Sequence, residues 1–523
     1  MMFTANKKEE PLESFRQGFD DIPAIVGTGL PQLRRARYLL VQIADARAAR
    51  SWLRALMASD VVHSLARVRA RNQPKKKVGR EPAPAKPSRD VAQMVTVAFS
   101  HAGLMALGVK EDARFPFPTP FRAGGASALR RQLLGDAQEP AWQWGDVASD
   151  TGFEAHLFIA HYWSEQLAGE PLGLLDPARL PAGLRALSIS SCPSYIASPD
   201  APEPAVFEPF GFRDGIGQPV IDGMGLSSAE KKSKQASGRL FDDRLIQPGE
   251  FVLGQLNEYG ERSYCPNVEG WPREASATGG FGRNGTYLAV RQIEQHVAVF
   301  NQFTASHARP LLGDMMVGRR KPGAACPKDA AGYSVLDSAR PPSEIDAFRY
   351  LTLDADGLEC PRGAHARRAN PRDALAAGVK VGIADSKLHR LLRRGRVYAE
   401  GCSQGASGAD VCAGHAAGRE GDTPCGRGLM FVALNSDLER QFEFVQKSWI
   451  AGPRFGDLAD EQDPLLGTDP DRAFTVQGCP VGERIGPLPR FTTVRGGGYF
   501  FAPSLTALRW LAQDKETAAA QPM

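Results

Sequence analysis

The sequence has 523 residues, of which 42% are hydrophobic and 23% are charged, as in an ordinary folded globular protein. This length exceeds what one hydrophobic core usually serves, so two domains are the default expectation. The net charge of +4 is small for the length and gives no reason to expect nucleic-acid binding. The longest apolar runs, such as residues 429–434, are far shorter than the roughly 20 residues of a membrane helix, so no membrane span is expected.

The N-terminal residues and the cysteines indicate a cytoplasmic protein. Residues 1–10 hold no apolar stretch of the kind that directs secretion. The eight cysteines follow no regular framework, which in a chain of this length indicates mostly reduced thiols. Cys402, Cys412, His415 and Cys425 fall in one Gly-rich segment, but no C-x-x-C pair is present there, so a surface loop is favoured over a zinc site.

The first half of the chain predicts strands that alternate with helices. Helical patterns with an apolar stripe cover residues 46–56 and 101–109. Residues 70–90 combine Pro with a basic run, which favours a solvated insertion over a contact patch. Apolar, β-branched runs predict strands at 37–43, at 94–100, at 154–163 (which also fits a buried helix) and at 251–256.

The second half repeats this order of elements. Helices are expected at 294–303 and at 436–449, with Ser436 as the N-cap of the second. Another helix is expected to end near residues 389–394. Strands are expected at 286–293, 429–434 and 488–503. The recurring order predicts an α+β fold of two ferredoxin-like domains, 20–265 and 280–515, with antiparallel strands and helices on one face.

One histidine stands in an unusually basic segment. His365 lies in CPRGAHARRANPRD at 360–373, at the start of a helix or in a tight turn, with Arg362, Arg367, Arg368 and Arg372 around it. A neutral imidazole among so many cations suggests a polyanionic partner, such as the propionates of a haem or a phosphate. Taken alone, the segment also fits a surface histidine in a basic loop.

Two further segments hold candidate charged groups. Asp214 lies among three glycines in EPFGFRDGIGQPVIDG at 208–223, where glycine lets a backbone approach a flat ligand, although an aspartate there also suits a simple turn. Arg393 follows an apolar pair in HRLLRRGRVYAEG at 389–401, where a helix end would explain it equally well.

Five segments in this order resemble the dye-decolorizing peroxidase family. They are GFRDGIGQP at 211–219, GAHARRANPRD at 363–373, LLRRGRVY at 391–398, RGLMFVALNSDLERQFEFVQ at 427–446 and LPRFTTVRGGGYFF at 488–501. The resemblance spans about residues 20–510 and is nearer the larger subgroups of the family. It implies two ferredoxin-like domains with antiparallel sheets packed together and one haem b per chain, held mainly by the second domain and capped by the loop around Asp214. The sequence departs from the simplest family pattern after Arg393.

The resemblance also implies roles for individual residues. His365 would be the axial ligand of the haem iron, and Asp463 would accept a hydrogen bond from its other ring nitrogen, with Asp460 and Glu461 close by in the sequence. Asp214 would carry the proton of the peroxide, and Arg393 would stabilise the separating negative charge. The residues expected to contact the haem are Gly211, Phe212, Arg213, Gly215, Arg367, Leu429 and Phe431.

The function implied is a haem peroxidase that reduces hydrogen peroxide and oxidises dyes, phenols or other organic donors through high-valent iron. Two alternatives stay open: a haem-binding or iron-releasing protein without peroxidase turnover, and a protein whose arginines bind phosphate or nucleic acid. The sequence does not identify the physiological donor, a surface Trp or Tyr at which bulky donors react, or the oligomeric state, a homo-oligomer included.

Overall fold

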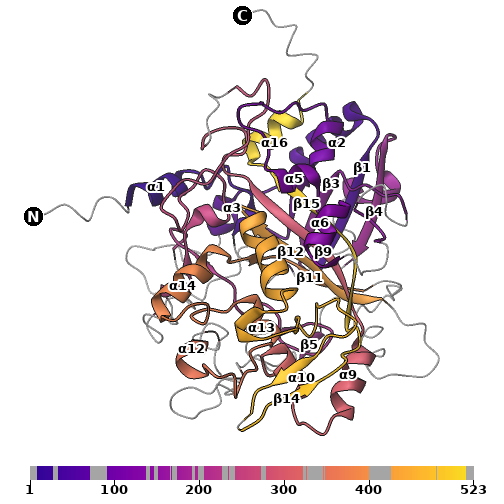
Figure 1. The fold of residues 1–523 in the computed structure, drawn as a ribbon. Helices are drawn as coiled ribbons and strands as arrows, with labels where there is room; N and C mark the ends of the chain where they lie inside the picture. Colours follow the sequence, from indigo (N-terminus) through magenta and orange to yellow (C-terminus); the bar gives the residue numbers. More distant parts are fainter. Residues whose placement is uncertain are drawn as a thin grey trace, which may run out of the picture.

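The structure is a computed structural model of the whole chain (Figure 1). It describes residues 9–513, apart from 28–32, 34, 71–90, 137–141, 146–150, 165–166, 168–172, 191–194, 198–204, 226–233, 235–241, 273–277, 322–325, 327–345, 347, 400–425 and 479. Almost all of the basic insertion predicted at 70–90, the segment from Cys402 to Cys425 and the C-terminal tail lie outside the described residues. Among the described residues, no helix has the length and apolar character that crossing a membrane requires.

A nine-stranded antiparallel sheet forms the centre of the described structure. Its strands from the first half are β1 (Arg35–Ile43), β2 (Gln93–Phe99), β3 (Leu157–Trp163) and β4 (Leu184–Ser190). Those from the second half are β9 (Thr286–Gln295), β10 (Leu392–Arg393), β11 (Arg396–Ala399), β12 (Arg427–Asn435) and β15 (Thr492–Ala502). Short two-stranded pairs are formed by β5 (Tyr195–Ala197) with β6 (Ala205–Phe207), β7 (Val220–Ile221) with β8 (Leu245–Ile246), and β13 (Phe474–Val476) with β14 (Glu483–Ile485).

The two halves of the sheet have the same strand order. In the first half the order in space is β4-β1-β3-β2, and in the second half it is β15-β9-β12-β10, with β11 also paired to β12. Each half therefore places its fourth, first, third and second strands side by side. The halves join where Phe501 of β15 pairs with Phe99 of β2. The α+β class with antiparallel strands agrees with the expectation, and the domain boundaries at 20–265 and 280–515 stay a prediction.

Helices cover the faces of this sheet (Figure 1). In the first half, Asp45 caps α2 by accepting hydrogen bonds from the backbone of Arg47 and Ala48, and α2 buries Trp52 and Leu53. The helices are α1 (Glu9–Gln17), α2 (Ala46–Ala58), α3 (Leu65–Ala70), α4 (His101–Ala106), α5 (Thr119–Ala123), α6 (Ala128–Leu133), α9 (Val297–Ser306), α10 (Leu312–Val317), α12 (Tyr350–Leu353), α13 (His365–Ala369), α14 (Val379–Leu388) and α16 (Leu505–Leu511).

Two of the predicted elements are wrong. Residues 251–256 form turns and not a strand, although Phe251, Val252 and Leu253 are fully buried. Gly254 takes the left-handed conformation (φ +76°) there, which ends any extended run. The apolar residues of this segment therefore indicated correctly that it is buried, but they did not determine its backbone conformation. Arg393 lies on β10 and not at a helix end, because α14 already stops at Leu388.

The helix predicted at 436–449 exists with a different start and a different winding. The described residues Glu439–Glu443 and Val445–Ile450 are wound as π-helix. The side chain of Asp437, and not that of Ser436, accepts the hydrogen bonds of the first turn, from the backbone N–H groups of Glu439 (3.1 Å) and Arg440 (3.0 Å). The N-cap prediction was therefore off by one residue.

Candidate active site

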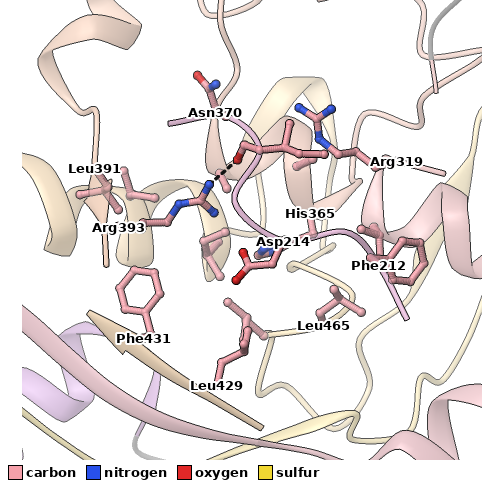
Figure 2. Close-up of a pocket in the computed structure, with 18 of the residues that line it drawn as sticks. Phe212, Asp214, Arg319, His365, Asn370, Leu391, Arg393, Leu429, Phe431 and Leu465 are labelled. Carbon is pink, nitrogen blue, oxygen red and sulfur yellow. Dashed lines mark hydrogen bonds between the residues drawn. The ribbon is translucent and has the colours of Figure 1, made fainter. Parts of the chain in front are cut away.

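A cavity of about 290 Å³, lined by residues from both halves of the chain, is at the lower end of the size range for small-molecule and cofactor sites. Its walls come from the loop at 208–217, from α13, from strand β12 and from the π-helical turns at 445–450. Figure 2 shows Asp214, Arg393 and His365 around the same space, with Leu429 and Phe431 along one side. The cavity therefore gathers residues that are far apart in the sequence.

His365 is the first residue of α13, and its partly exposed side chain lines the cavity. Its Nδ1 lies 2.8 Å from Oδ2 of Asp463, whose side chain is fully buried. The other oxygen of Asp463 accepts hydrogen bonds from the backbone N–H groups of Leu465 and Leu466, each at 2.9 Å, so the carboxylate cannot rotate away. A proton on Nδ1 leaves the lone pair of Nε2 for a metal ion, as in metal-ligating histidines held by a carboxylate.

The charges of this pair stabilise each other. Burial lowers the pKa of His365, but the charge and hydrogen bond of Asp463 outweigh burial and raise it above its ordinary value. Burial alone would raise the pKa of Asp463, but the charges of His365 and Arg368 hold it below its usual range. Asp463 is therefore a carboxylate, which is the form that accepts a hydrogen bond from the imidazole.

The loop at 208–217 forms another wall, and Glu208 shapes it. Its carboxylate accepts hydrogen bonds from the backbone N–H groups of Phe212 (2.8 Å) and Phe210 (3.1 Å) and from the side-chain amide of Gln295 (2.6 Å). Burial raises the pKa of Glu208, although these hydrogen bonds oppose the shift. The loop can turn this tightly because its glycines at 211, 215 and 217 all adopt left-handed φ angles.

Asp214 and Arg393 face the cavity from this side (Figure 2). Asp214 accepts a hydrogen bond through Oδ1 from the backbone N–H of Gly215 (2.6 Å). Arg393 is fixed at two points, because its Nη2 donates to the carbonyl of Ile216 (2.5 Å) and its backbone N–H donates to Oε1 of Gln218 (3.1 Å). The structure thus brings an acidic and a basic group to the cavity that the imidazole also lines.

The sides of the cavity are apolar. Leu429 and Phe431 lie on β12, and Leu465, Val445 and Trp449 complete the lining around them. Phe431 packs against the ring of Phe442, with ring centroids 6.0 Å apart. Such walls suit a flat, mostly apolar ligand.

The structure places most of the predicted contact residues at the cavity. Phe212, Arg213 and Gly215 line it, while Gly211 lies behind the lining residues. Arg367 also does not reach the cavity. Its Nη1 donates to Asp354 (3.3 Å) and to the carbonyl of Cys360 (2.9 Å), and its guanidinium stacks 4.8 Å from the ring of Tyr350.

Other lining residues were missed by the sequence reasoning. Arg372 was noted only as part of the basic cluster, and Arg319 falls in a short Gly-Arg-Arg-Lys run at 318–321 that could have attracted attention. Arg390 and Asn370 carry no signal of their own, because each lies in a segment whose charges also suit a helix end or a turn. Together these side chains give one end of the cavity a strongly positive character.

Comparisons with known proteins agree with this arrangement. Residues 26–167 match the family model of the DyP dimeric alpha+beta barrel domain. The chain is 28% identical to a dye-decolorizing peroxidase of Exidia glandulosa over 438 residues, which cover 79% of this chain and 74% of the relative. It is 30% identical over 257 residues to the multifunctional dye peroxidase DyP2 of Amycolatopsis, covering 43% of this chain and 49% of that protein.

Solved structures are similar over nearly the whole chain. An ancestral D-type dye decolorizing peroxidase is 25% identical with a TM-score of 0.65, covering 95% of this chain and 99% of the other. A DyP-type peroxidase of the fungus Auricularia auricula-judae, at 23% identity, has the same fold with a TM-score of 0.65, and the coverage is again 95% and 99%. The family model over residues 26–167, the curated relatives and the shared fold thus agree that this chain is similar to dye-decolorizing peroxidases.

Proposed function

We propose that this chain is a haem peroxidase that holds one haem b in the cavity, with His365 as the iron ligand and with Asp214 and Arg393 acting on hydrogen peroxide. The observation that carries the proposal is that two kinds of group line one cavity. One wall presents an imidazole braced by the buried carboxylate of Asp463. The other presents a carboxylate and a guanidinium, as peroxide cleavage requires.

The residues present fit a haem. The apolar walls suit the faces of a porphyrin, and the partly exposed imidazole faces the space where an iron would lie. Arg319, Arg372 and Arg390 line one end, where the buried carboxylate of Asp346 contacts two of them. Burial lowers the pKa of Arg390 to about 9, and the neighbouring charge of Arg372 adds to this shift. The two carboxylates of a haem would give these cations a negative partner.

The chain's own groups then have distinct tasks. When bound, the haem supplies an iron that takes up peroxide and receives its two oxidising equivalents. Asp463 fixes the orientation of His365 and increases its donor strength. Asp214 accepts the proton from one peroxide oxygen and delivers it to the departing oxygen. Arg393 contributes a permanent positive charge beside the separating oxygen, and Leu429 and Phe431 keep bulk water away.

Variants of the two distal residues test this assignment. Asp214→Asn and Arg393→Leu should leave the haem bound but slow the reaction with hydrogen peroxide by about a hundredfold or more, since each removes a group that acts on the O–O bond. Stopped-flow spectra after mixing with peroxide measure the rate. Asp222→Asn is a matched control, because Asp222 accepts the N–H of Gly223 (2.8 Å) as Asp214 accepts that of Gly215 but does not line the cavity.

Wild-type rates in both distal variants would overturn the assignment. His365→Ala should instead lose the haem or its normal Soret band, and an unchanged spectrum would exclude His365 as the ligand. An iron-releasing protein without turnover would need neither Asp214 nor Arg393, so a steady-state assay with a phenol or dye separates that alternative.

Hydrogen peroxide and a phenol or dye are the proposed substrates. One structural relative, 23% identical with a TM-score of 0.66, is a dye-decolorizing peroxidase in complex with 2,6-dimethoxyphenol, which supports a phenol as donor. We also propose a cytoplasmic location. The described cysteines Cys265, Cys326 and Cys360 are free and buried, in agreement with a reducing compartment. The oligomeric state stays open.

A further inference from the structure

Three consecutive carbonyl groups of the loop that carries Asp214 are held by arginine side chains from elsewhere in the chain. Each carbonyl accepts a hydrogen bond from the Nη2 atom of a different arginine. The pairs are Arg393 with Ile216 (2.5 Å), Arg390 with Gly217 (3.3 Å) and Arg244 with Gln218 (3.4 Å). Hydrogen bonds from charged donors are stronger than those between neutral groups, so this part of the loop is firmly placed.

A buried carboxylate, that of Asp346, lies near these arginines and pairs directly with one of them, Arg244. The carboxylate of Asp346 is 1% exposed and accepts a hydrogen bond from Arg319 (2.8 Å) and another from Arg372, while Nε of Arg244 lies 3.6 Å away. Burial would raise the pKa of Asp346, but Arg372, Arg319, Arg244 and Arg390 together hold it well below its usual range. Asp346 is therefore an anion that keeps several cations in place.

Asp346 also lies directly against the loop. A Cβ atom built on Gly217 would be 3.9 Å from Oδ1 of Asp346 and 3.7 Å from Nη2 of Arg393. The left-handed φ of +80° at Gly217 strains any side chain there as well. The loop, Arg393 and Asp346 thus meet at a position that glycine leaves open.

Gln218 gives the loop a second hydrogen bond with Arg393, besides the one that the carbonyl of Ile216 accepts. Its side-chain Oε1 accepts the backbone N–H of Arg393 (3.1 Å), and its own carbonyl accepts from Arg244. Neither Gln218 nor Asp346 lines the cavity. Any effect of Gln218 on the reaction must therefore pass through the loop and Arg393, and any effect of Asp346 through the arginines that it contacts.

We propose that Gln218 and Asp346 are positioning residues that fix the separation of Asp214 and Arg393 on the peroxide side of the cavity. Gln218 fastens the backbone of Arg393 to the loop. Asp346 pairs with Arg244, which donates a hydrogen bond to the loop carbonyl of Gln218. This inference rests on the proposed function, because it assigns the two residues an effect on the same reaction. Displacing reacting groups by about 1 Å can slow a reaction about a hundredfold.

The test compares two substitutions of Gln218 in the haem-loaded enzyme. Gln218→Leu removes the acceptor and should lower the rate constant for hydrogen peroxide by about tenfold to a hundredfold. It should also weaken the binding of cyanide by a similar factor, while the haem content, the resting Soret band and KM for the organic donor stay unchanged. Gln218→Glu keeps an acceptor for the backbone N–H of Arg393, so it should recover most of the rate.

Gln247→Leu is the matched control, since Gln247 contacts Asp222 (3.5 Å) on the neighbouring turn and no catalytic group. It should keep the wild-type values. Asp346→Asn should act in the same direction as Gln218→Leu. If Asp346→Asn fails to fold, the Gln218 pair still decides the matter.

Hydrogen exchange separates this inference from the proposed function. Amide exchange in the peptide that contains Arg393 should be faster in Gln218→Leu, whatever the residues do in catalysis. Wild-type peroxide rates in Asp214→Asn and Arg393→Leu would refute the proposed function itself. If those variants are slow but Gln218→Leu keeps wild-type peroxide and cyanide constants, or Gln218→Glu recovers nothing, the positioning role is wrong.

Discussion

At the scale of single residues, Asp346 and Asp314 show how the number of neighbouring cations sets the ionisation of a buried carboxyl. Asp346 faces several arginines, and their charges hold its pKa well below the usual range despite burial. Asp314 has Arg320 as its ion-pair partner at 3.5 Å, and burial raises its pKa above the ordinary value in spite of that charge. Opposite shifts give opposite dependences of stability on pH.

The lowered pKa of Asp346 predicts that the folded protein loses stability in acid. A folded-state pKa below the unfolded value of about 3.9 means that its stabilising contribution is complete above that pH and is lost as the pH falls through the folded value. Asp346→Asn should therefore flatten the loss of unfolding free energy below about pH 4, by up to about 1.4 kcal/mol per pH unit. Urea unfolding of the haem-loaded protein between pH 3 and pH 6 measures this.

Asp314→Asn is the matched comparison for Asp346→Asn. Because the pKa of Asp314 is raised, the folded state gains stability as the pH falls through that value, and Asp314→Asn removes the gain. Its acid slope should be steeper than that of the wild type. Parallel curves for the wild type and Asp346→Asn would contradict the assignment of charge to Asp346.

The site residues differ in how far the sequence could predict them. His365, Asp214 and Arg393 sit in segments whose residue order resembles a known family, so they could be named before the structure. The pairing of His365 with Asp463 was also expected, and the 2.8 Å contact agrees with it. Asp346 could not be found this way, because nothing in its own segment indicates that arginines from three other parts of the chain surround it.

At the scale of elements, the helix after β12 supplies the cavity wall and departs most from expectation. Its π-helical turns place Val445, Trp449 and Ile450 in the lining. The amphipathic pattern predicted a helix here, but the pattern of apolar residues cannot distinguish α from π winding, since both keep one face buried. Single π-helical turns occur frequently at functional sites.

The first turn of this helix gives a test of the cap. Asp437→Ala removes the acceptor of two backbone N–H groups and should lower the free energy of unfolding by about 1 kcal/mol. Ser436→Ala should cost far less, because the buried hydroxyl of Ser436 makes no hydrogen bond in the structure. Thermal and urea unfolding of the two variants compare them directly. A larger loss from Ser436→Ala would restore the N-cap expected from the sequence.

At the scale of the whole molecule, the repeated strand order explains how two units become one sheet. Alternate residues of β1 enter two cores, Tyr38 and Leu40 on one face and Leu39 and Val41 on the other. Both cores also take residues of β9 and β15 from the second half. The sequence could predict two similar units from the recurring order of elements. It could not predict that β2 and β15 join them, because edge pairing depends on which strands remain uncovered once each unit has folded.

The positive end of the cavity makes the stability of the whole protein depend on the charge of its cofactor. Haem should raise the melting temperature, by the free energy that a ligand of the folded state contributes, about 2.7 kcal/mol at a hundredfold excess over Kd. Haem dimethyl ester, which lacks the two carboxylates, should stabilise less, since charge-assisted hydrogen bonds contribute about 1.5–3 kcal/mol each. Calorimetry of protein loaded with each cofactor measures the difference.

An arginine variant shows whether the carboxylates meet the expected residues. Arg319 lines the cavity and also bonds to Asp346, so Arg319→Gln should reduce the advantage of haem over its dimethyl ester. Arg362→Gln is the control, because Arg362 pairs with Asp457 (3.3 Å) away from the cavity lining and should leave that advantage unchanged. The advantage of haem over its ester is compared between variant and wild type. This comparison removes the effect that the substitution alone, or the cofactor alone, has on stability. If haem and its ester stabilise the wild type equally, the arginines at this end of the cavity do not hold the carboxylates, and their surplus charge must be balanced by some other anion.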